Sequence, residues 1–128
     1  MSEYNPDLSK NLIVQLTFDF ALEVVKYAEL LELSRHYVIG NQLLKSGTSI
    51  GANVREAQNA ESRPDFIHKF KISAKEADET EYWLLLCKYS KDYPECEQLL
   101  QKIDQIKKVL SKIIATSKKH QRINESSN

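Results

Sequence analysis

Residues 62–87 read SRPDFIHKFKISAKEADETEYWLLLC and contain the clearest helix start in the chain. Ser62 can serve as an N-cap, Pro64 is tolerated in a first helical turn, and Asp65 follows Ser62 at the spacing of a capping box. Apolar or small residues then recur at three- and four-residue steps, at Phe66, Phe70, Ser73, Ala77, Thr80, Leu84 and Cys87. This periodicity predicts one long amphipathic helix over about residues 63–91.

Three further segments, 8–33, 41–59 and 95–121, show helical periodicity. The last one has a heptad seam at Leu99, Ile103, Ile106, Leu110 and Ile113. The first has one apolar stripe at Leu12, Leu16, Phe20, Val24, Ala28 and Leu31, and a second beside it at Phe18, Leu22 and Val25. The segment 41–59 follows an expected turn at Gly40, and its stripe is Leu43, Leu44, Gly47, Ile50, Val54 and Ala57. Because an interior glycine costs a helix up to about 1 kcal/mol, we expect a packing reason for Gly47.

Length and composition predict a single all-α domain over residues 1–128. The 128 residues are 41% hydrophobic and 28% charged, which is typical of a packed globular protein. Only three glycines and three prolines occur, too few for the turns of a sandwich or barrel. Connections of about five residues favour antiparallel neighbours, so we expect an up-and-down four-helix bundle.

The surplus of apolar residues bears on assembly. The first and third helices carry apolar residues on more than one stripe, so a lone bundle would leave apolar surface in water. Self-association would cover that surface. The alternative is that the second stripes face both neighbouring helices within one bundle.

Charge and cysteine usage exclude several classes of protein. The chain has 18 basic and 18 acidic residues, so no global field draws it to nucleic acid or membrane. It has no leader-like N-terminus and no run of eighteen apolar residues, which leads us to expect a cytoplasmic protein with no membrane association. Cys87 and Cys96 match neither a disulfide framework nor a zinc signature, and buried reduced thiols are expected.

No catalytic or cofactor motif occurs in the chain, so we expect neither enzymatic activity nor a cofactor. Only Asp65-x-x-His68 comes near the Glu-x-x-His pairs of di-metal bundles, and such a centre needs that motif twice. A metal or small-ligand site between Glu56, Glu76, Glu79 and His68 stays open as an alternative.

Basic residues form local groups that are candidates for nucleic-acid contact. These residues are Lys45, Arg55, Lys107, Lys108, Lys112, Lys118, Lys119 and Arg122. Lys69, Lys71 and Lys75 give the third helix a smaller basic group. A solvated helix face is the simpler interpretation, but an oligomer would repeat each patch, and phosphate contacts add in number.

The second and third helices also carry polar stripes. Ser46, Ser49, Asn53 and Glu56 share one helix face, and Ser73, Glu76 and Thr80 share another. The two stripes could meet, with small residues allowing close approach and hydrogen bonds fixing the register. We interpret them as assembly residues in preference to a ligand pocket.

The segments KSGTSIGANVREA (45–57) and SAKEADETEYWL (73–84) resemble the 23S rRNA intervening-sequence proteins. The patterns are Ser-Ile-x-x-Asn-Val-x-Glu and Ser-x-x-Glu-x-x-Glu-Thr-x-x-Trp-Leu, and the resemblance covers essentially the whole chain. It implies a left-handed antiparallel four-helix bundle, a ring-like homopentamer, a bacterial source and no enzymatic activity. A related branch, the accessory variability proteins of diversity-generating retroelements, binds nucleic acid through a basic surface. This chain departs from that branch in its neutral charge, and it has Lys45, Arg55 and Ala57 where the family usually has arginine, alanine and glycine.

These observations lead to one functional hypothesis and two alternatives. The hypothesis is a non-enzymatic oligomer that presents a surface to RNA or to an RNA-associated protein. The alternatives are a purely structural oligomer and the metal- or ligand-binding bundle.

Overall fold

The computed structural model describes residues 8–126, with side chains from 12 to 125, and this part of the chain is entirely helical. The helices are α1 (Leu8–Leu33), α2 (Tyr37–Ala57), α3 (Arg63–Tyr89) and α4 (Glu97–Ser126). The predicted all-helical class is therefore confirmed. Residues 1–7, on which the expectation of no leader depends, lie outside the described part. No described helix is long and apolar enough to cross a membrane.

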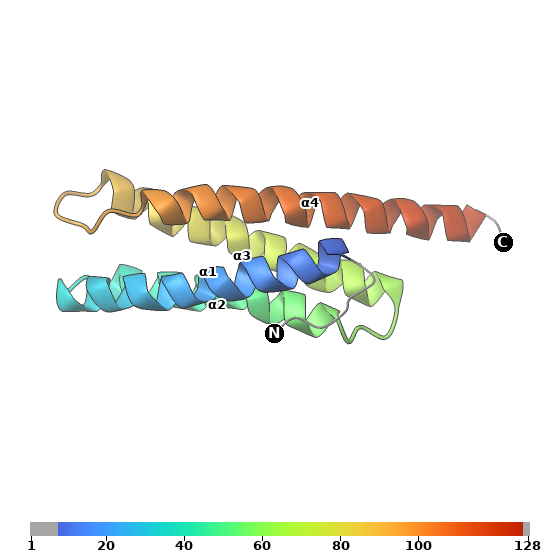
Figure 1. Cartoon of the computed structure of the whole chain (residues 1–128), viewed down its shortest axis with the longest axis horizontal. Helices are drawn as coiled ribbons and strands as arrows, with labels where there is room; N and C mark the ends of the chain where they lie inside the picture. The colour runs from blue at the N-terminus through green and yellow to red at the C-terminus, as the bar shows by residue number, and fades with distance from the viewer. Residues whose placement is uncertain (1–7, 127–128) are drawn as a thin grey trace.

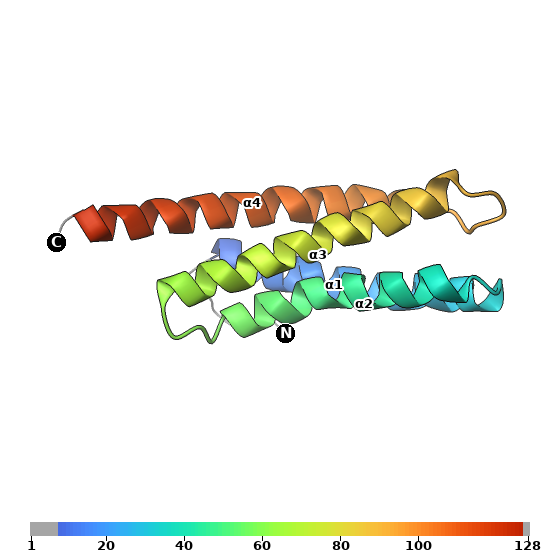
Figure 2. The same ribbon diagram turned by 180° about the vertical axis from the view of Figure 1, so that it is seen from behind.

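Each helix packs against the next one in the chain, and α1 also packs against α4. In Figures 1 and 2 the chain reverses direction at each connection, and α4 extends past the start of α1. α1 and α3 therefore run the same way along the bundle, opposite to α2 and α4. The left-handed twist stays a prediction.

Two of the predicted core stripes are buried as expected. In α3, the hydroxyl of Ser62 accepts a hydrogen bond from the Asp65 backbone N–H at 3.2 Å, and Pro64 lies in the first turn, so the predicted cap is confirmed. Every residue of the predicted α3 stripe is buried. The α4 seam from Leu99 to Ile113 is also buried.

The core stripe predicted for α1 is wrong at its start. Leu12 is 48% exposed, and the residues that enter the core are Ile13, Thr17, Phe20, Val24, Tyr27 and Leu31. Four-residue steps drift around a helix of 3.6 residues per turn, whereas alternating four and three keep to one face. The second stripe, Phe18, Leu22 and Val25, remains 39–52% exposed to water.

The turn between α1 and α2 comes earlier than predicted. The backbone N–H of His36 donates to the Leu31 carbonyl at 2.7 Å, and that of Arg35 donates to the Glu32 carbonyl at 3.0 Å. This is a Schellman motif with Arg35 in the left-handed position, at φ 66°. Gly40, predicted as the turn, is buried inside α2.

The other helix ends shift for similar local reasons. α2 ends at Ala57 and not at 59, α3 ends at Tyr89 and not at 91, and α4 begins at Glu97, beyond Pro94. α4 continues to Ser126 instead of ending at 121, because residues 114–126 contain neither glycine nor proline to break it.

Gly47 has the packing reason that its position in a helix demands. A Cβ atom there would lie 2.8 and 2.9 Å from the two methyl carbons of Val24 in α1, closer than side chains allow. Glycine thus lets α1 and α2 approach with Val24 between them. This gain offsets the propensity cost of an interior glycine.

Candidate functional site

The polar stripes of α2 and α3 meet at two points inside the chain. The hydroxyl oxygens of Thr80 and Ser46 are 2.9 Å apart, and Thr80 also donates to the Glu76 carbonyl at 2.7 Å. Because a hydroxyl has one proton, Ser46 supplies the proton of the shared bond when Thr80 donates to Glu76. The Ser73 hydroxyl donates to the Ile50 carbonyl at 2.9 Å. Ser46, Ser73 and Thr80 are buried, so these bonds fix the register of α2 against α3.

The remaining stripe residues lie nearer to water. Ser49 donates to the Lys45 carbonyl at 2.7 Å, and Asn53 donates to the Ser49 carbonyl at 2.9 Å, both within α2. Glu56 accepts from the Lys69 ammonium at 2.9 Å, an ion pair between α2 and α3. The seven predicted residues thus divide into a buried seam within the chain and a partly exposed row beside it. Their role in assembly stays a prediction.

Glu76 has an unfavourable environment for its charge. It is half-buried on α3, and burial, followed by repulsion from Glu79, raises its pKa. Lys45 and Lys75 act in the opposite direction. The carboxyl of Glu79 accepts instead from the indole N–H of Trp83 at 3.1 Å.

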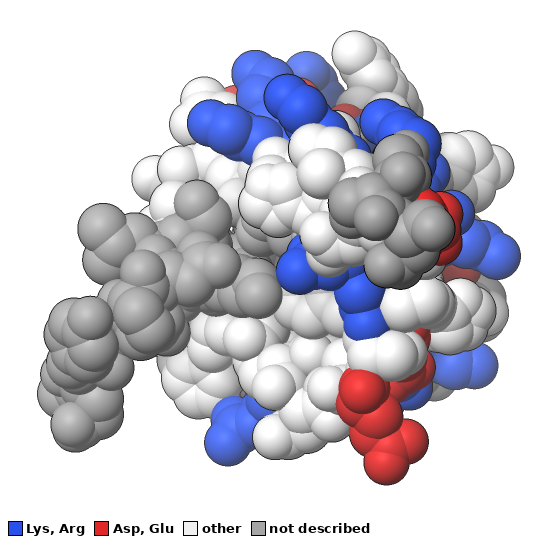
Figure 3. All heavy atoms as spheres, turned by 90° about the vertical axis from the view of Figure 1, so that its right-hand side faces the viewer, with Lys and Arg blue, Asp and Glu red and all other residues white. Residues whose placement is uncertain are grey.

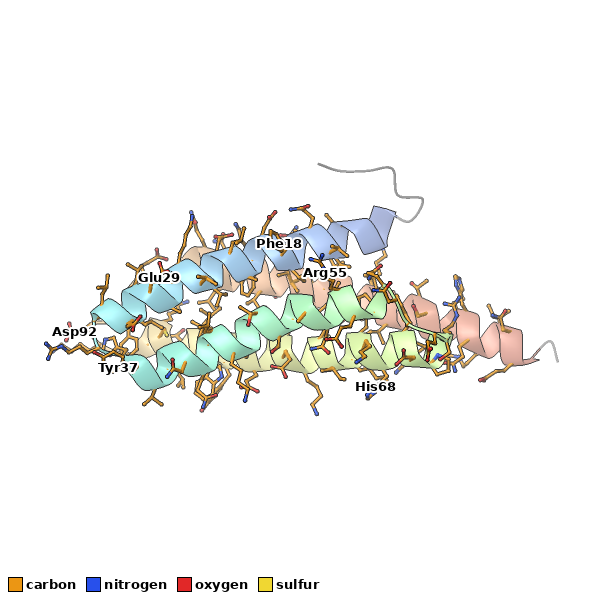
Figure 4. The ribbon with its side chains drawn as sticks, turned by 90° about the horizontal axis from the view of Figure 1, so that it is seen from below. Phe18, Glu29, Tyr37, Arg55, His68 and Asp92 are labelled. Carbon is orange, nitrogen blue, oxygen red and sulfur yellow. The ribbon has the colours of Figure 1, made fainter. Side chains whose placement is uncertain are left out.

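The described residues contain no group of three or more His, Cys, Asp and Glu side chains placed to hold a metal ion. Glu56 pairs with Lys69 and Glu79 with Trp83, while His68 lies exposed on α3. Figure 4 shows His68 on the outer side of α3, away from α1. The alternative of a metal site between these residues and Glu76 gains no support from this arrangement.

Two hollows lie along the boundary between α1 and α2, and together we call them the α1–α2 groove. Its larger part, about 760 Å³, is lined by Val14, Gln15, Thr17, Phe18, Ala21, Thr48, Gly51, Ala52 and Arg55. A second part of about 200 Å³ is lined by Val25, Ala28, Glu29, Glu32, Tyr37, Gly40, Asn41 and Leu44. Figure 4 shows Phe18 and Arg55 toward one end of the α1–α2 boundary, and Glu29 and Tyr37 toward the other end. The small residues of the floor leave the groove open.

The groove is bordered by exposed apolar side chains of α1 and by Leu44 of α2. Phe18 and Leu22 are 52% and 50% exposed, and Val25 and Leu44 are more than one-third exposed. The predicted second stripe is therefore apolar surface in water, as the surplus of apolar residues indicated. The alternative, that this stripe faces both neighbouring helices within one bundle, accounts for only part of it, because Phe18 lines the groove against α2 and yet keeps half of its surface in water, as Leu22 does.

Two of the predicted basic contacts are already matched by acids. The Lys107 ammonium lies 2.8 Å from Glu81 and 3.0 Å from Asp78, and the hydrogen bond that it donates to Glu81 raises its pKa most. It joins α4 to α3. Lys108 pairs with Asp104 one turn away at 3.1 Å. Arg55 lines the groove, and Lys45 lies near Glu76 on the α2–α3 side.

A different cation cluster forms where α3 begins and α4 ends. Lys71 on α3 lies against Lys118 on α4 and lowers the pKa of Lys118, with a smaller effect from Arg122. The end view in Figure 3 shows Lys and Arg atoms spread over the upper part, where α4 lies, and the acidic atoms mostly lower down. The sequence grouped Lys118 and Arg122, but it gave no signal that Lys71 joins them.

The two cysteines are buried and free, as expected for buried thiols. Burial raises the pKa of Cys87 to about 11 and also raises that of Cys96. Nearby, the Tyr27 hydroxyl donates to the Pro94 carbonyl at 2.6 Å, and the Cys96 thiol donates to the Leu84 carbonyl at 3.4 Å. These thiols are protonated and enclosed at neutral pH, which suits a packing role.

This combination of helices, polar seam and motif residues defines a class of all-helical protein, and comparison identifies the family. Residues 9–112 match the model of the 23S rRNA-intervening sequence protein family, so the chain belongs to that family. The chain is also similar to a crystal structure from Bacteroides thetaiotaomicron, described as a protein of unknown function from the S23 ribosomal protein family. The two share 40% identity with a TM-score of 0.79, over 84% of this chain and 98% of that one. No curated protein matches the chain.

Proposed function

We propose that the protein is a non-enzymatic subunit of a ring-like homo-oligomer, a homopentamer, that acts in the bacterial cytoplasm and presents a basic surface to RNA. Each subunit is an antiparallel left-handed four-helix bundle. The observation that carries the assembly is the exposed apolar surface of α1 beside the α1–α2 groove. Burying such a surface stabilises an oligomer by about 25 cal/mol per Å² before the entropy of association is subtracted.

The RNA-binding part of the proposal rests on the cluster of Lys71, Lys118 and Arg122. Cations held at close range repel one another. A phosphate that binds between them removes this repulsion and forms charge-assisted hydrogen bonds, so its binding is favourable. A ring repeats this cluster once in each subunit, and contacts along one RNA strand then add. A chain that is neutral overall can thus bind RNA through a local surface.

Light scattering coupled to gel filtration tests the assembly. We expect a single oligomeric mass over a wide range of protein concentration. A monomer at every concentration would overturn the proposed function.

Electrophoretic mobility shift with single-stranded RNA at low salt tests the RNA contact. We expect the triple variant Lys71→Gln, Lys118→Gln and Arg122→Gln to lose most binding, and the slope of log affinity against log salt to fall by about 2 per bound subunit. A matched control removes three exposed charges, Lys26, Arg35 and Lys91, which lie outside this cluster.

The outcomes of these measurements distinguish the proposed RNA contact from the purely structural oligomer and from the metal-binding alternative. Equal RNA affinity of the triple variant and its control would remove the cluster as the contact. Assembly without RNA or DNA retardation at micromolar wild-type protein would favour the purely structural oligomer. Stoichiometric iron, manganese or zinc in the purified protein would favour the metal-binding alternative.

A further inference from the structure

The outer edge of α3 carries an apolar ridge that no part of the proposed function uses. We call Tyr82, Leu85 and Tyr89 the α3 ridge; they are 57%, 39% and 79% exposed. They lie at steps of three and four residues, so they share one side of the helix. The Tyr82 ring packs edge-on against Trp83, with ring centroids 5.3 Å apart, which supports it from behind.

A single cation stands within this ridge. The Lys88 ammonium lies 5.4 Å from the centroid of the Tyr89 ring and 3.5 Å from the Glu97 carboxylate. Both groups are exposed, so the ion pair contributes little to the fold and can exchange partners at the surface. The ridge therefore combines apolar side chains with an exposed lysine whose present acidic partner, Glu97, can be exchanged for another carboxylate.

The groove end formed by Val25 and Leu44 has the opposite character. Its apolar walls are rimmed by Glu29 and Glu32, and Tyr37 closes it. Its charge is thus complementary to that of the α3 ridge.

The groove end and the ridge lie at the same height along the bundle. Ser46 meets Thr80 and Ile50 meets Ser73, so moving back along α2 corresponds to moving forward along α3. Leu44, two residues before Ser46, is therefore level with α3 about two residues beyond Thr80, near Tyr82. Asn41 lies about one turn before Leu44 in α2, so it and Glu29 of α1 are level with the part of α3 one turn beyond Tyr82, near Leu85 and Lys88. This estimate uses a rise of about 1.5 Å per residue in each helix.

Cyclic symmetry makes this shared height informative. In a ring whose bundles stand along the ring axis, the subunits are related by rotation without translation along that axis. A surface of one copy then meets a surface of the next copy at the same height. The direction matches too, because α3 of the neighbour would run parallel to α1, as it does within one chain (Figure 1).

The placement of the two surfaces also favours closure. The α1–α2 groove and the outer edge of α3 lie on different sides of the bundle, with outward directions less than 180° apart in an idealised four-helix arrangement. Contacts repeated at an angle below 180° curve into a ring, whereas opposed surfaces would extend into a fibre.

We propose that the α3 ridge of one copy docks in the α1–α2 groove of the next, with Tyr82 and Leu85 against Val25 and Leu44, and with Lys88 facing Glu29 and Glu32. The proposal rests on the assembly proposed above and names its two contact surfaces. The contact is head-to-tail, so the two halves belong to different subunits.

Mixing two variants tests this arrangement directly. Leu44→Glu places a charge in the groove, and Tyr82→Glu places one on the ridge; both residues are exposed, so neither change disturbs the core. We expect each variant alone to be a monomer by light scattering, with helicity retained. An equimolar mixture should form a one-to-one dimer, because one intact groove and one intact ridge remain. Leu30→Glu is the matched control, since Leu30 is 49% exposed and lines the α1–α4 side instead.

Charge reversal tests the register of the contact. We expect Lys88→Glu to raise the dissociation constant about tenfold or more, and Glu29→Lys with Glu32→Lys to recover most of the loss in the same chain. If the wild-type protein is an oligomer and Tyr82→Glu has the same mass, this contact is overturned and the proposed assembly remains. The same holds if the mixture of Leu44→Glu and Tyr82→Glu forms no dimer. A wild-type monomer would overturn both.

Discussion

Replacing Thr80 with valine tests whether the polar seam between α2 and α3 acts within one subunit. Valine keeps the shape of threonine and substitutes a methyl group for the hydroxyl. The change removes the 2.9 Å contact with the Ser46 hydroxyl. Ser46 then keeps only a 3.5 Å hydrogen bond to the Leu43 carbonyl, at the limit of hydrogen-bonding distance. Because Ser46 is 1% exposed, water cannot replace the lost partner.

The expected size of the effect follows from these partners. A lost hydrogen bond lowers the free energy of unfolding by about 1 kcal/mol, and a poorly satisfied buried hydroxyl adds to this, for a total of about 1–3 kcal/mol. Ser46→Ala should lower it by at most about 1 kcal/mol, because Thr80 still donates to the Glu76 carbonyl. The double variant removes both hydroxyls of this contact and leaves neither one unsatisfied, so its loss should be smaller than the sum of the two single losses by about 1 kcal/mol.

Urea unfolding followed by circular dichroism, at one fixed protein concentration, measures these differences. The fixed concentration matters because self-association adds to apparent stability. Ser49→Ala is the matched control, since the Ser49 hydroxyl bonds only within its own helix and is partly exposed. Additive losses, within about 0.5 kcal/mol, would show that the two hydroxyls do not interact. A changed subunit number in Thr80→Val would place the seam at a subunit contact and refute our assignment.

Two further substitutions probe α2 and its neighbours. Gly47→Ala should lower the free energy of unfolding by about 1–3 kcal/mol despite the higher helix propensity of alanine, because its Cβ meets the Val24 methyls. In a Val24→Ala background the same change should become neutral or stabilising. An equal loss in both backgrounds, measured by urea unfolding, would contradict this packing. Burial, and then Glu79, raise the pKa of Glu76, so the native state favours its protonated form and this preference is lost as pH rises through the folded pKa. Glu76→Gln should therefore raise the urea midpoint more at pH 7 than at pH 4, and an equal shift at both would refute the assignment.

The elements that the sequence predicts well are those encoded locally. The cap at Ser62 depends on residues within one turn, and the α4 seam depends on a strict heptad, so both are confirmed. The register of α2 against α3 was also accessible, because Ser46 and Thr80 stand on faces whose polar residues need partners in a buried contact.

The face of α1 was harder to predict for a physical reason. α1 is apolar on two sides, so the sequence alone does not show which side meets the core and which meets water. Leu12 continues one stripe at four-residue spacing, but Ile13 and Thr17 continue the one that keeps to a single face. The choice is made by packing against α2 and α4.

The start of α2 was missed because its turn breaks a residue preference. Left-handed backbone favours glycine, which pointed to Gly40. The chain instead places Arg35 in that conformation, where the Schellman hydrogen bonds hold it. Gly40 then packs on the side chain of Leu31, because a Cβ atom at Gly40 would lie 3.4 Å from the Leu31 Cβ.

The cation cluster and the α3 ridge depend on tertiary placement. Lys71 and Lys118 are distant in sequence and become neighbours only when α3 and α4 pack. In the sequence, Leu85 directly follows Leu84 of the predicted core stripe, so its position alone does not show that it stays partly exposed. Exposure of Tyr82 and Tyr89 follows from the rotation of α3, which its core residues fix.

The small residues of α2 connect the packing of α1 against α2 to the shape of the groove between them. Gly47 lets Val24 approach α2, and at Gly51 a Cβ would already lie 3.3 Å from the Thr17 carbonyl oxygen. Both glycines hold α1 close, while Gly51 and Ala52 also form the floor of the groove. A larger residue on this side would therefore separate the helices and fill the groove at once. Gly51, which weakens α2 as an isolated helix, thus also shapes the larger part of the groove, beside the exposed Phe18 side chain.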